Sequence, residues 1–225
     1  MVFLMVWLRW ARKPLLAAKL SPKLPARITS NERQRIALAA QEQLAEHRAV
    51  FATIQPEEIA KAAVSLADVL CNGGRVFLCG NGGSAACASD IAAHLCAIKR
   101  QEAAPFAAHA FADFTTMSQI GNSVGFEHVF AEQVKRWVTK ADCFWAFCAT
   151  GRSENVVAAL RAAWSIGALR IGMVPEKTAA AAACSHVVST KPAASVRIEE
   201  CNSIAAHAIV ALATQLVKQS AEEEL

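Results

Sequence analysis

The stretch RVFLCGNGGSAA (residues 75–86) decides the fold, because an apolar run passes directly into a glycine-rich turn and then into small helix-forming residues. An uninterrupted apolar strand is typical of a parallel sheet buried on both faces, since an exposed face would require alternating polar residues. Glycines between the strand and the helix let backbone N–H groups approach a ligand closely. The stretch therefore predicts a strand–turn–helix unit with a binding turn.

The same alternation of apolar strands and helices continues along the chain. Strands are expected at 75–80, 106–111, 143–149, 169–174 and 185–190. Helices are expected from 31 to about 50 and from 56 to 70, both amphipathic. Further helices are expected from the first turn to about 97 and at 127–138, 155–166 and 198–218, with a short alanine-rich helix at 179–183. This order predicts an α/β fold, a three-layer sandwich with a five-stranded parallel sheet flanked by helices, with ligands beyond the carboxyl ends of the strands.

Composition limits the class of protein. With 225 residues, 54% apolar and 19% charged, the chain supports one core, and we expect a single domain over residues 31–225. No apolar run reaches the roughly 20 residues of a spanning helix. Eight cysteines without a Cys-x-x-Cys pair indicate buried, reduced thiols and a cytoplasmic protein.

The first 30 residues differ from the rest. Six basic and no acidic residues precede Glu32, so the remainder of the chain has a small negative balance and no basic patch that would predict a nucleic-acid partner. The apolar run 1–8 precedes the positive charges, which is the wrong order for a secretory signal. We expect residues 1–30 to be a flexible extension; a transit peptide or surface anchor is the alternative.

The first turn is a candidate anion site. Asn81, Gly82, Gly83 and Ser84 stand between strand and helix, where converging N–H groups and the helix dipole favour a phosphate. The same letters fit the dinucleotide fingerprint, which also needs an acidic residue about 20 positions on; Asp113 lies too far along the chain. We therefore expect phosphate binding and no nucleotide cofactor, the alternative being a tight turn without a ligand.

The turn after the third strand is a second candidate. Thr150 and Ser153 offer hydroxyls, Arg152 offers a cation, and Gly151 leaves the backbone accessible. Helix capping by Ser153 alone would also account for a serine at this position, and one residue can serve both roles. Two such turns at one sheet edge predict a single phosphate-binding crevice.

The motifs CGNGGSAA, TGRSENV and RIEE, the last at the start of the final helix, resemble those of the sugar isomerase (SIS) family, in its sedoheptulose 7-phosphate isomerase branch. The resemblance covers roughly residues 33–218. It implies a flavodoxin-like sheet and a sugar phosphate held by Ser/Thr-rich turns, with Asn122 among the binding residues. It also implies a homotetramer in which the N-terminal helices pack together and the sites lie at subunit interfaces.

Two differences from the family affect the phosphate turn and the catalytic set. The family's Ser-Thr-Ser-Gly-Asn-Ser corresponds here to residues 148–153, CATGRS, so two hydroxyls are missing and an arginine is added. The four family positions that read His, Glu, Gln and His correspond here to Asp90, His94, Glu199 and His207. The resemblance implies His207, Glu199 and His94 as catalytic groups and all four residues as ligands of Zn²⁺ or another divalent metal.

These residues leave two functions open. Aldose–ketose isomerisation needs an acid–base pair around an enediol, and the retained His207 favours an enzyme. His94 in place of the family's glutamate favours a non-catalytic sugar-phosphate-binding regulator or scaffold, similar to replication-initiator-associating proteins. Ile98, Ser123 and Val196 replace polar family residues, which predicts a different substrate selectivity.

Overall fold

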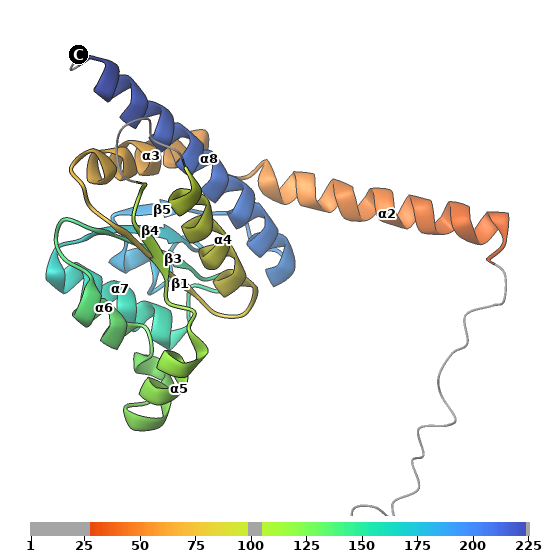
Figure 1. Cartoon of the computed structure of the whole chain (residues 1–225). Helices are drawn as coiled ribbons and strands as arrows, with labels where there is room; N and C mark the ends of the chain where they lie inside the picture. The colour runs from red at the N-terminus through yellow and green to blue at the C-terminus, as the bar shows by residue number, and fades with distance from the viewer. Residues whose placement is uncertain (1–27, 99–104, 224–225) are drawn as a thin grey trace, which may run out of the picture. The chain divides into compact units, whose positions relative to one another are not determined.

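The computed structural model describes residues 28–98 and 105–223, which fall into two compact units divided after Gln43. Residues 44–223 contain the predicted five-stranded parallel sheet (Figure 1). Its strands are β1 (Val76–Gly80), β2 (Ala108–Ala110), β3 (Cys143–Phe147), β4 (Leu169–Met173) and β5 (His186–Val188). Their order is β2-β1-β3-β4-β5, so the chain reverses its direction of growth between β1 and β3. In sheets of this order, ligands bind where those two strands end.

Helices cover both faces of the sheet, as the apolar strands predict. On one face lie α3 (Pro56–Cys71), α4 (Gly83–Ala97) and α8 (Ser195–Glu223); on the other lie α6 (Ala131–Trp137) and α7 (Glu154–Ile166) (Figure 1). Successive strand residues serve alternate cores: Leu78 and Trp145 pack beneath α3, α4 and α8, whereas Phe77 and Phe144 pack beneath α6 and α7. The three-layer prediction is confirmed.

Helix boundaries follow local signals. Pro56 occupies the first turn of α3, where its missing N–H costs nothing. Gly167 ends α7 in the left-handed conformation, with φ of 83°. Thr29 and Glu32 form a capping box at the start of α2 (Ser30–Phe51), with each side chain bonded to the other residue's backbone N–H.

Four local predictions need correction. Helix α5 (Phe114–Ser123) was not expected, and the helix predicted at 127–138 is a 3-10 turn, η2 (Phe126–His128), followed by α6. The alanine run forms only a 3-10 turn, η3 (Ala181–Ala183). Helix α2 forms, but none of its residues is buried, so its predicted amphipathic face covers no core within the described chain. The predicted extension at 1–30 lies outside the described residues except for its last three positions.

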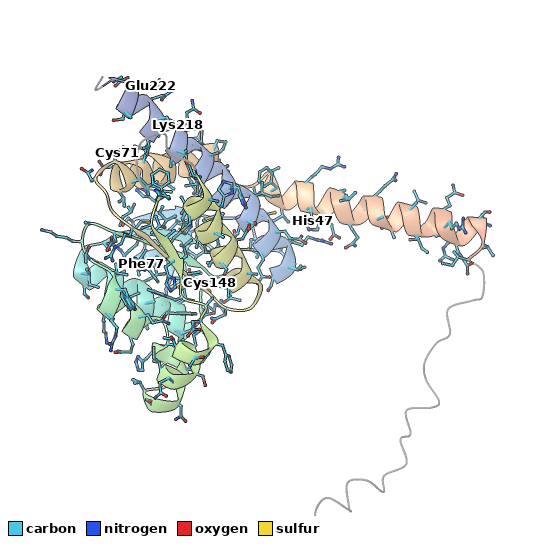
Figure 2. All side chains as sticks on the ribbon, in the orientation of Figure 1. His47, Cys71, Phe77, Cys148, Lys218 and Glu222 are labelled. Atoms are coloured by element: carbon cyan, nitrogen blue, oxygen red, sulfur yellow. The ribbon has the colours of Figure 1, made fainter. Side chains whose placement is uncertain are left out.

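The end of α2 is fixed to the start of α8 by polar contacts. Arg197 donates to Glu46 through Nε at 3.0 Å and also contacts His47, and His47, labelled in Figure 2, pairs with Glu200.

A second ionic contact lies at the opposite end of the sheet, where Asp142 is 2% exposed. It accepts from Arg75 Nε at 3.1 Å, from Nη2 at 2.9 Å and from the Arg75 backbone N–H at 2.9 Å. These contacts join α2 to α8, and the residue before β1 to the residue before β3.

The cysteines and the helices bear on the expected compartment. All eight cysteines are free thiols, four of them buried, while Cys71 and Cys96 are exposed against expectation. Among the described residues, no helix is both long and apolar enough to cross a membrane.

Candidate active site

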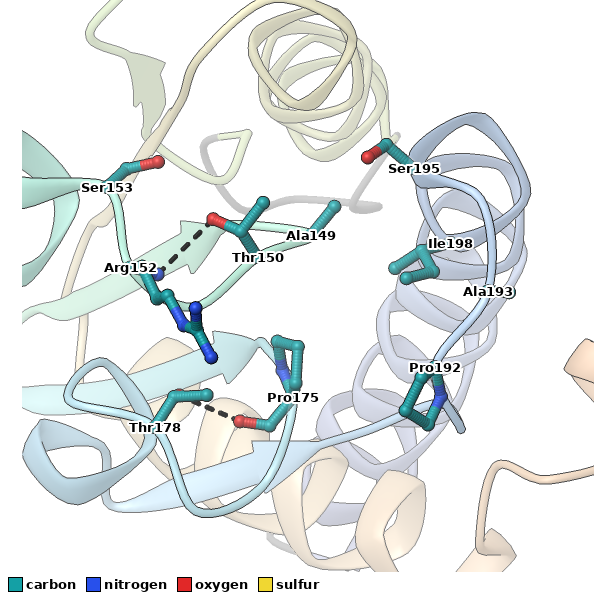
Figure 3. Close-up of a pocket in the computed structure, with 10 residues that line it drawn as sticks. All are labelled: Ala149, Thr150, Arg152, Ser153, Pro175, Thr178, Pro192, Ala193, Ser195 and Ile198. Atoms are coloured by element: carbon teal, nitrogen blue, oxygen red, sulfur yellow. Dashed lines mark hydrogen bonds between the residues drawn. The ribbon is translucent and has the colours of Figure 1, made fainter.

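A hollow of about 600 Å³ opens at the carboxyl ends of the strands. We call it the strand-end hollow, and its lining residues are Ala149, Thr150, Arg152, Ser153, Pro175, Thr178, Pro192, Ala193, Ser195 and Ile198 (Figure 3). The turn after β3 forms one side and the start of α8 forms the other. Its volume lies within the range of about 300–1,000 Å³ that is usual for small-molecule sites.

The turn after β3 presents the polar groups predicted for an anion. Thr150, Arg152 and Ser153 line the hollow, and Thr150 Oγ1 accepts from the Arg152 backbone N–H at 3.3 Å (Figure 3). Gly151 is buried with φ of 63°, and a Cβ there would lie 2.4 Å from Thr178 Oγ1, so only glycine fits the bend. The turn is therefore rigid where its backbone must approach a ligand.

Cys148, where the resemblance places a serine, lies at the base of this turn (Figure 2). Its Sγ lies 3.3 Å from Ser153 Oγ and 3.6 Å from Thr150 Oγ1. Burial alone would raise the pKa of this thiol, but hydrogen bonding with Ser153 and Thr150 lowers the pKa below its ordinary value. The turn thus stabilises negative charge even on its own thiol.

The glycine-rich turn after β1 contacts a carboxylate of the protein itself. A Cβ on Gly83 would lie 2.2 Å from Glu199 Oε2, so the Glu199 carboxylate rests directly against the first residue of α4. Ser84, 4% exposed, approaches Glu199 Oε1 at 3.5 Å. Negative charge at this position is favoured by the dipole of α4. This helix end holds Glu199, and Gly82, Gly83 and Ser84 do not line the strand-end hollow; phosphate binding by these residues stays a prediction.

Asn81, a predicted phosphate-binding residue, has a side-chain partner in the structure. Its amide exchanges two hydrogen bonds with the amide of Asn155, each 2.9 Å long. Asn155 was not predicted as a site residue, although it lies within the TGRSENV motif; only the folded structure brings the two asparagines together. The turns after β1 and β3 are therefore joined directly by side chains.

Further along the seam between α4 and α8, three of the four predicted metal ligands lie together, two of which were also predicted to be catalytic. His207 Nε2 is 3.4 Å from Asp90 Oδ2, and the His207 and His94 rings meet edge to face with centroids 5.2 Å apart. His207 Nδ1 lies 2.9 Å from the Ser203 carbonyl oxygen, which makes Nδ1 the protonated nitrogen. Nε2 is then the ring nitrogen that faces Asp90 and is available to exchange a proton.

The four residues do not fit a single metal site. Glu199 lies about two turns before His207 on α8, and its carboxylate is held at Gly83. Among the described residues, no group of three or more His, Cys, Asp or Glu side chains is arranged to hold a metal ion. No step of the chemistry below is therefore assigned to a metal.

The remaining candidates lie elsewhere or were missed. Asn122 is exposed on α5 and does not line the strand-end hollow. Asp113, considered for a nucleotide, caps α5 by accepting from the Thr116 N–H at 2.7 Å. Thr178 and Ser195 line the hollow but were not predicted, because neither stands in a recognisable motif.

Comparison with known proteins identifies the class. The SIS domain profile matches residues 38–174, more than half of the chain, so the chain belongs to the SIS domain family. Its curated relatives include a phosphoheptose isomerase of Solidesulfovibrio magneticus, 34% identical over 172 residues that cover 76% of this chain and 84% of the relative. The chain thus falls in the phosphoheptose isomerase branch of the family.

Solved structures agree with this placement. The phosphoheptose isomerase of Neisseria gonorrhoeae superposes with a TM-score of 0.71 at 28% identity, covering 81% of this chain and 98% of that chain. The phosphoheptose isomerase of Francisella tularensis has the same TM-score at 25% identity, covering 84% of this chain and all of that one. The resemblance inferred from the three motifs is confirmed.

Proposed function

We propose that the protein is a phosphosugar isomerase that interconverts the ketose and aldose forms of a sugar phosphate such as sedoheptulose 7-phosphate. The observation that carries this proposal is the hydroxyl- and arginine-lined turn at the strand-end hollow, next to a seam of acid–base side chains, in a chain of the phosphoheptose isomerase branch. The names of the relatives favour an enzyme over the non-catalytic alternative.

In this proposal the turn after β3 holds the phosphate. The hydroxyls of Thr150 and Ser153 donate to phosphate oxygens, the N-terminus of α7 contributes its dipole, and Arg152 adds a full positive charge. Arg152 replaces by charge the two hydroxyls that the family carries elsewhere in the turn. The lowered pKa of Cys148 supports this assignment, because the same groups that favour a thiolate favour a phosphate.

The chemistry is assigned to side chains on the seam between α4 and α8. Isomerisation removes a proton from the carbon next to the carbonyl, forms an enediol, and returns a proton to the neighbouring carbon. Glu199 follows Ile198, a lining residue of the hollow, and its carboxylate is oriented by Gly83 and Ser84. We assign Glu199 as the group that moves the carbon-bound proton.

His207 is assigned to the proton on oxygen. Its Nδ1 is held by the Ser203 carbonyl, so Nε2 exchanges the proton, and Asp90 stabilises the imidazolium that forms. His94 packs edge-on against this ring and fixes its orientation. His94 is therefore a positioning residue in this proposal.

Three broader predictions remain part of the proposal. Residues 31–225 act as one SIS domain, the protein works in the cytoplasm, and it assembles as a homotetramer with sites at subunit interfaces. The exposed apolar residues Ile36, Leu38 and Leu44 on α2 support assembly through the N-terminal helix.

The test is direct. Purified protein is incubated with sedoheptulose 7-phosphate in D₂O and followed by ¹³C and ¹H NMR. Isomerisation predicts an aldose product that carries deuterium at the carbon that was reprotonated. Neither product nor deuterium exchange, with phosphate binding retained, would contradict the isomerase and favour the non-catalytic alternative.

A further inference from the structure

The two ligand-side turns are connected by one amide pair, in which Asn155 is buried and Asn81 half-buried. Asn81 directly follows β1, and Asn155 lies in the first turn of α7 after β3. Asn81 Nδ2 donates to Asn155 Oδ1, and Asn155 Nδ2 donates to Asn81 Oδ1, both at 2.9 Å. Asn155 Oδ1 also accepts from the Val156 N–H at 2.9 Å. The pair spans 74 residues of sequence, so it is a tertiary contact.

Burial makes this pair expensive to break. Asn155 is 3% exposed, and the loss of Asn81 would leave its Nδ2 donor without this hydrogen bond away from water, although Oδ1 would keep the Val156 N–H. Space is open beside Gly82 in the turn after β1, because a Cβ there would meet nothing within 4 Å. The amide pair is therefore a specific restraint on a turn with open space beside it.

The pair lies between the turn proposed to bind phosphate and the helix start that holds Glu199. β1 and β3 are adjacent parallel strands, with Gly80 opposite Phe147 at their ends. Beyond β3 stands the turn with Thr150 and Ser153; beyond β1 stands the start of α4, against which Glu199 rests. A restraint between these two strand ends fixes the separation between the proposed phosphate seat and the proposed catalytic carboxylate.

We propose that Asn81 and Asn155 are positioning residues that set this separation, so that a sugar anchored by its phosphate presents its reacting carbons to Glu199. This inference rests on the proposed function and replaces the prediction that Asn81 binds phosphate. In this proposal the amides of the pair act through each other, and the phosphate is held by the turn after β3. A misplacement of about 1 Å at a reacting centre costs on the order of 100-fold in rate.

The test separates anchoring from positioning. Binding of inorganic phosphate and of sedoheptulose 7-phosphate is measured by calorimetry for the wild type, Asn81→Ala and Asn155→Ala. The matched control is Gln133→Ala, which removes another buried side-chain amide; Gln133 lies in α6 and donates at 2.8 Å to the carbonyl of Val129, just before that helix. All variants are first compared by thermal unfolding.

We expect both asparagine variants to lose at least about 10-fold in sugar-phosphate affinity or kcat/KM and to keep inorganic phosphate affinity within about 3-fold. The control is expected to retain both affinities even if its thermal midpoint falls equally. Parallel loss of both ligands, selective loss of inorganic phosphate, or no change in either would overturn the positioning role.

A double-mutant cycle on stability tests the pair independently of turnover. Because each alanine already removes the whole contact, Asn81→Ala/Asn155→Ala should cost little more than the worse single variant. Additive losses would contradict the pair as a unit. Absence of turnover or ligand binding in the wild type would instead contradict the proposed function, and the cycle would still decide whether the pair acts as a unit.

Discussion

Replacing Gly83 with alanine is a small change aimed at Glu199. The new Cβ would lie 2.2 Å from Glu199 Oε2, whereas ordinary contact begins at 3.4 Å. The carboxylate must therefore retreat by about 1.2 Å, which its flexible side chain can do at little energetic cost. The substitution thus moves the proposed catalytic carboxylate and leaves its chemistry intact.

The expected effects on stability and activity differ in size. Alanine gains up to about 1 kcal/mol of helix propensity over glycine in the first turn of α4, so thermal stability should change little. A displacement of about 1.2 Å at a reacting group should lower kcat/KM by roughly 10- to 100-fold, or about 1.4–2.7 kcal/mol of transition-state free energy. Inorganic phosphate binding, assigned to the turn after β3, should be retained.

The assay is steady-state isomerisation with phosphate as a competitive inhibitor. Gly121→Ala in α5 is the control, because a Cβ there would lie 3.7 Å from its nearest neighbour, Val129, which is an ordinary contact distance. It should keep full activity and gain slight stability. Full activity in Gly83→Ala would refute the assignment of Glu199, since its carboxylate cannot stay where it is.

Three further predictions concern Arg152, zinc binding and Asp142. Arg152→Ala should weaken inorganic phosphate binding by about 10- to 100-fold, measured by calorimetry, and an unchanged affinity would remove the arginine from the site. Zinc titrated into chelator-treated protein should show no submicromolar binding; such a site, lost in His207→Ala, would contradict the separation of Glu199 from the His207 cluster. Burial opposes ionisation of Asp142, but hydrogen bonds from Arg75 and Thr139 hold its pKa below 3.8, so its stabilisation is complete above about pH 4 and is lost as the pH falls through the lowered value. Asp142→Asn should cost about 2–3 kcal/mol at pH 7 and flatten the decline of the thermal midpoint below pH 4, and an unchanged acid profile would contradict this.

The sheet could be predicted because each strand carries its own signal. Apolar runs such as that ending at Cys79, each bounded by a turn, identify buried parallel strands without knowledge of distant contacts. Helix α5 was missed because Thr115 and Thr116 are poor helix formers and none of the helix is buried. Its start depends on the Asp113 cap, a short-range contact that is hard to distinguish from a loop.

The site was only partly predictable, for a physical reason. Thr150, Arg152 and Ser153 are neighbours in sequence, so their shared turn is visible in the letters. The contact of Glu199 with Gly83 depends on how closely α8 approaches the end of α4, and the Asn81–Asn155 pair depends on strand adjacency. Neither distance is encoded locally, so neither contact could be predicted from the sequence.

The most direct measurement is a crystal structure of the protein with sedoheptulose 7-phosphate. The phosphorus should lie against Thr150, Arg152 and Ser153, with the first two carbons of the sugar within reach of the Glu199 carboxylate. A phosphate seated at Gly82 and Gly83 with Glu199 displaced, or a sugar bound outside the strand-end hollow, would contradict the account.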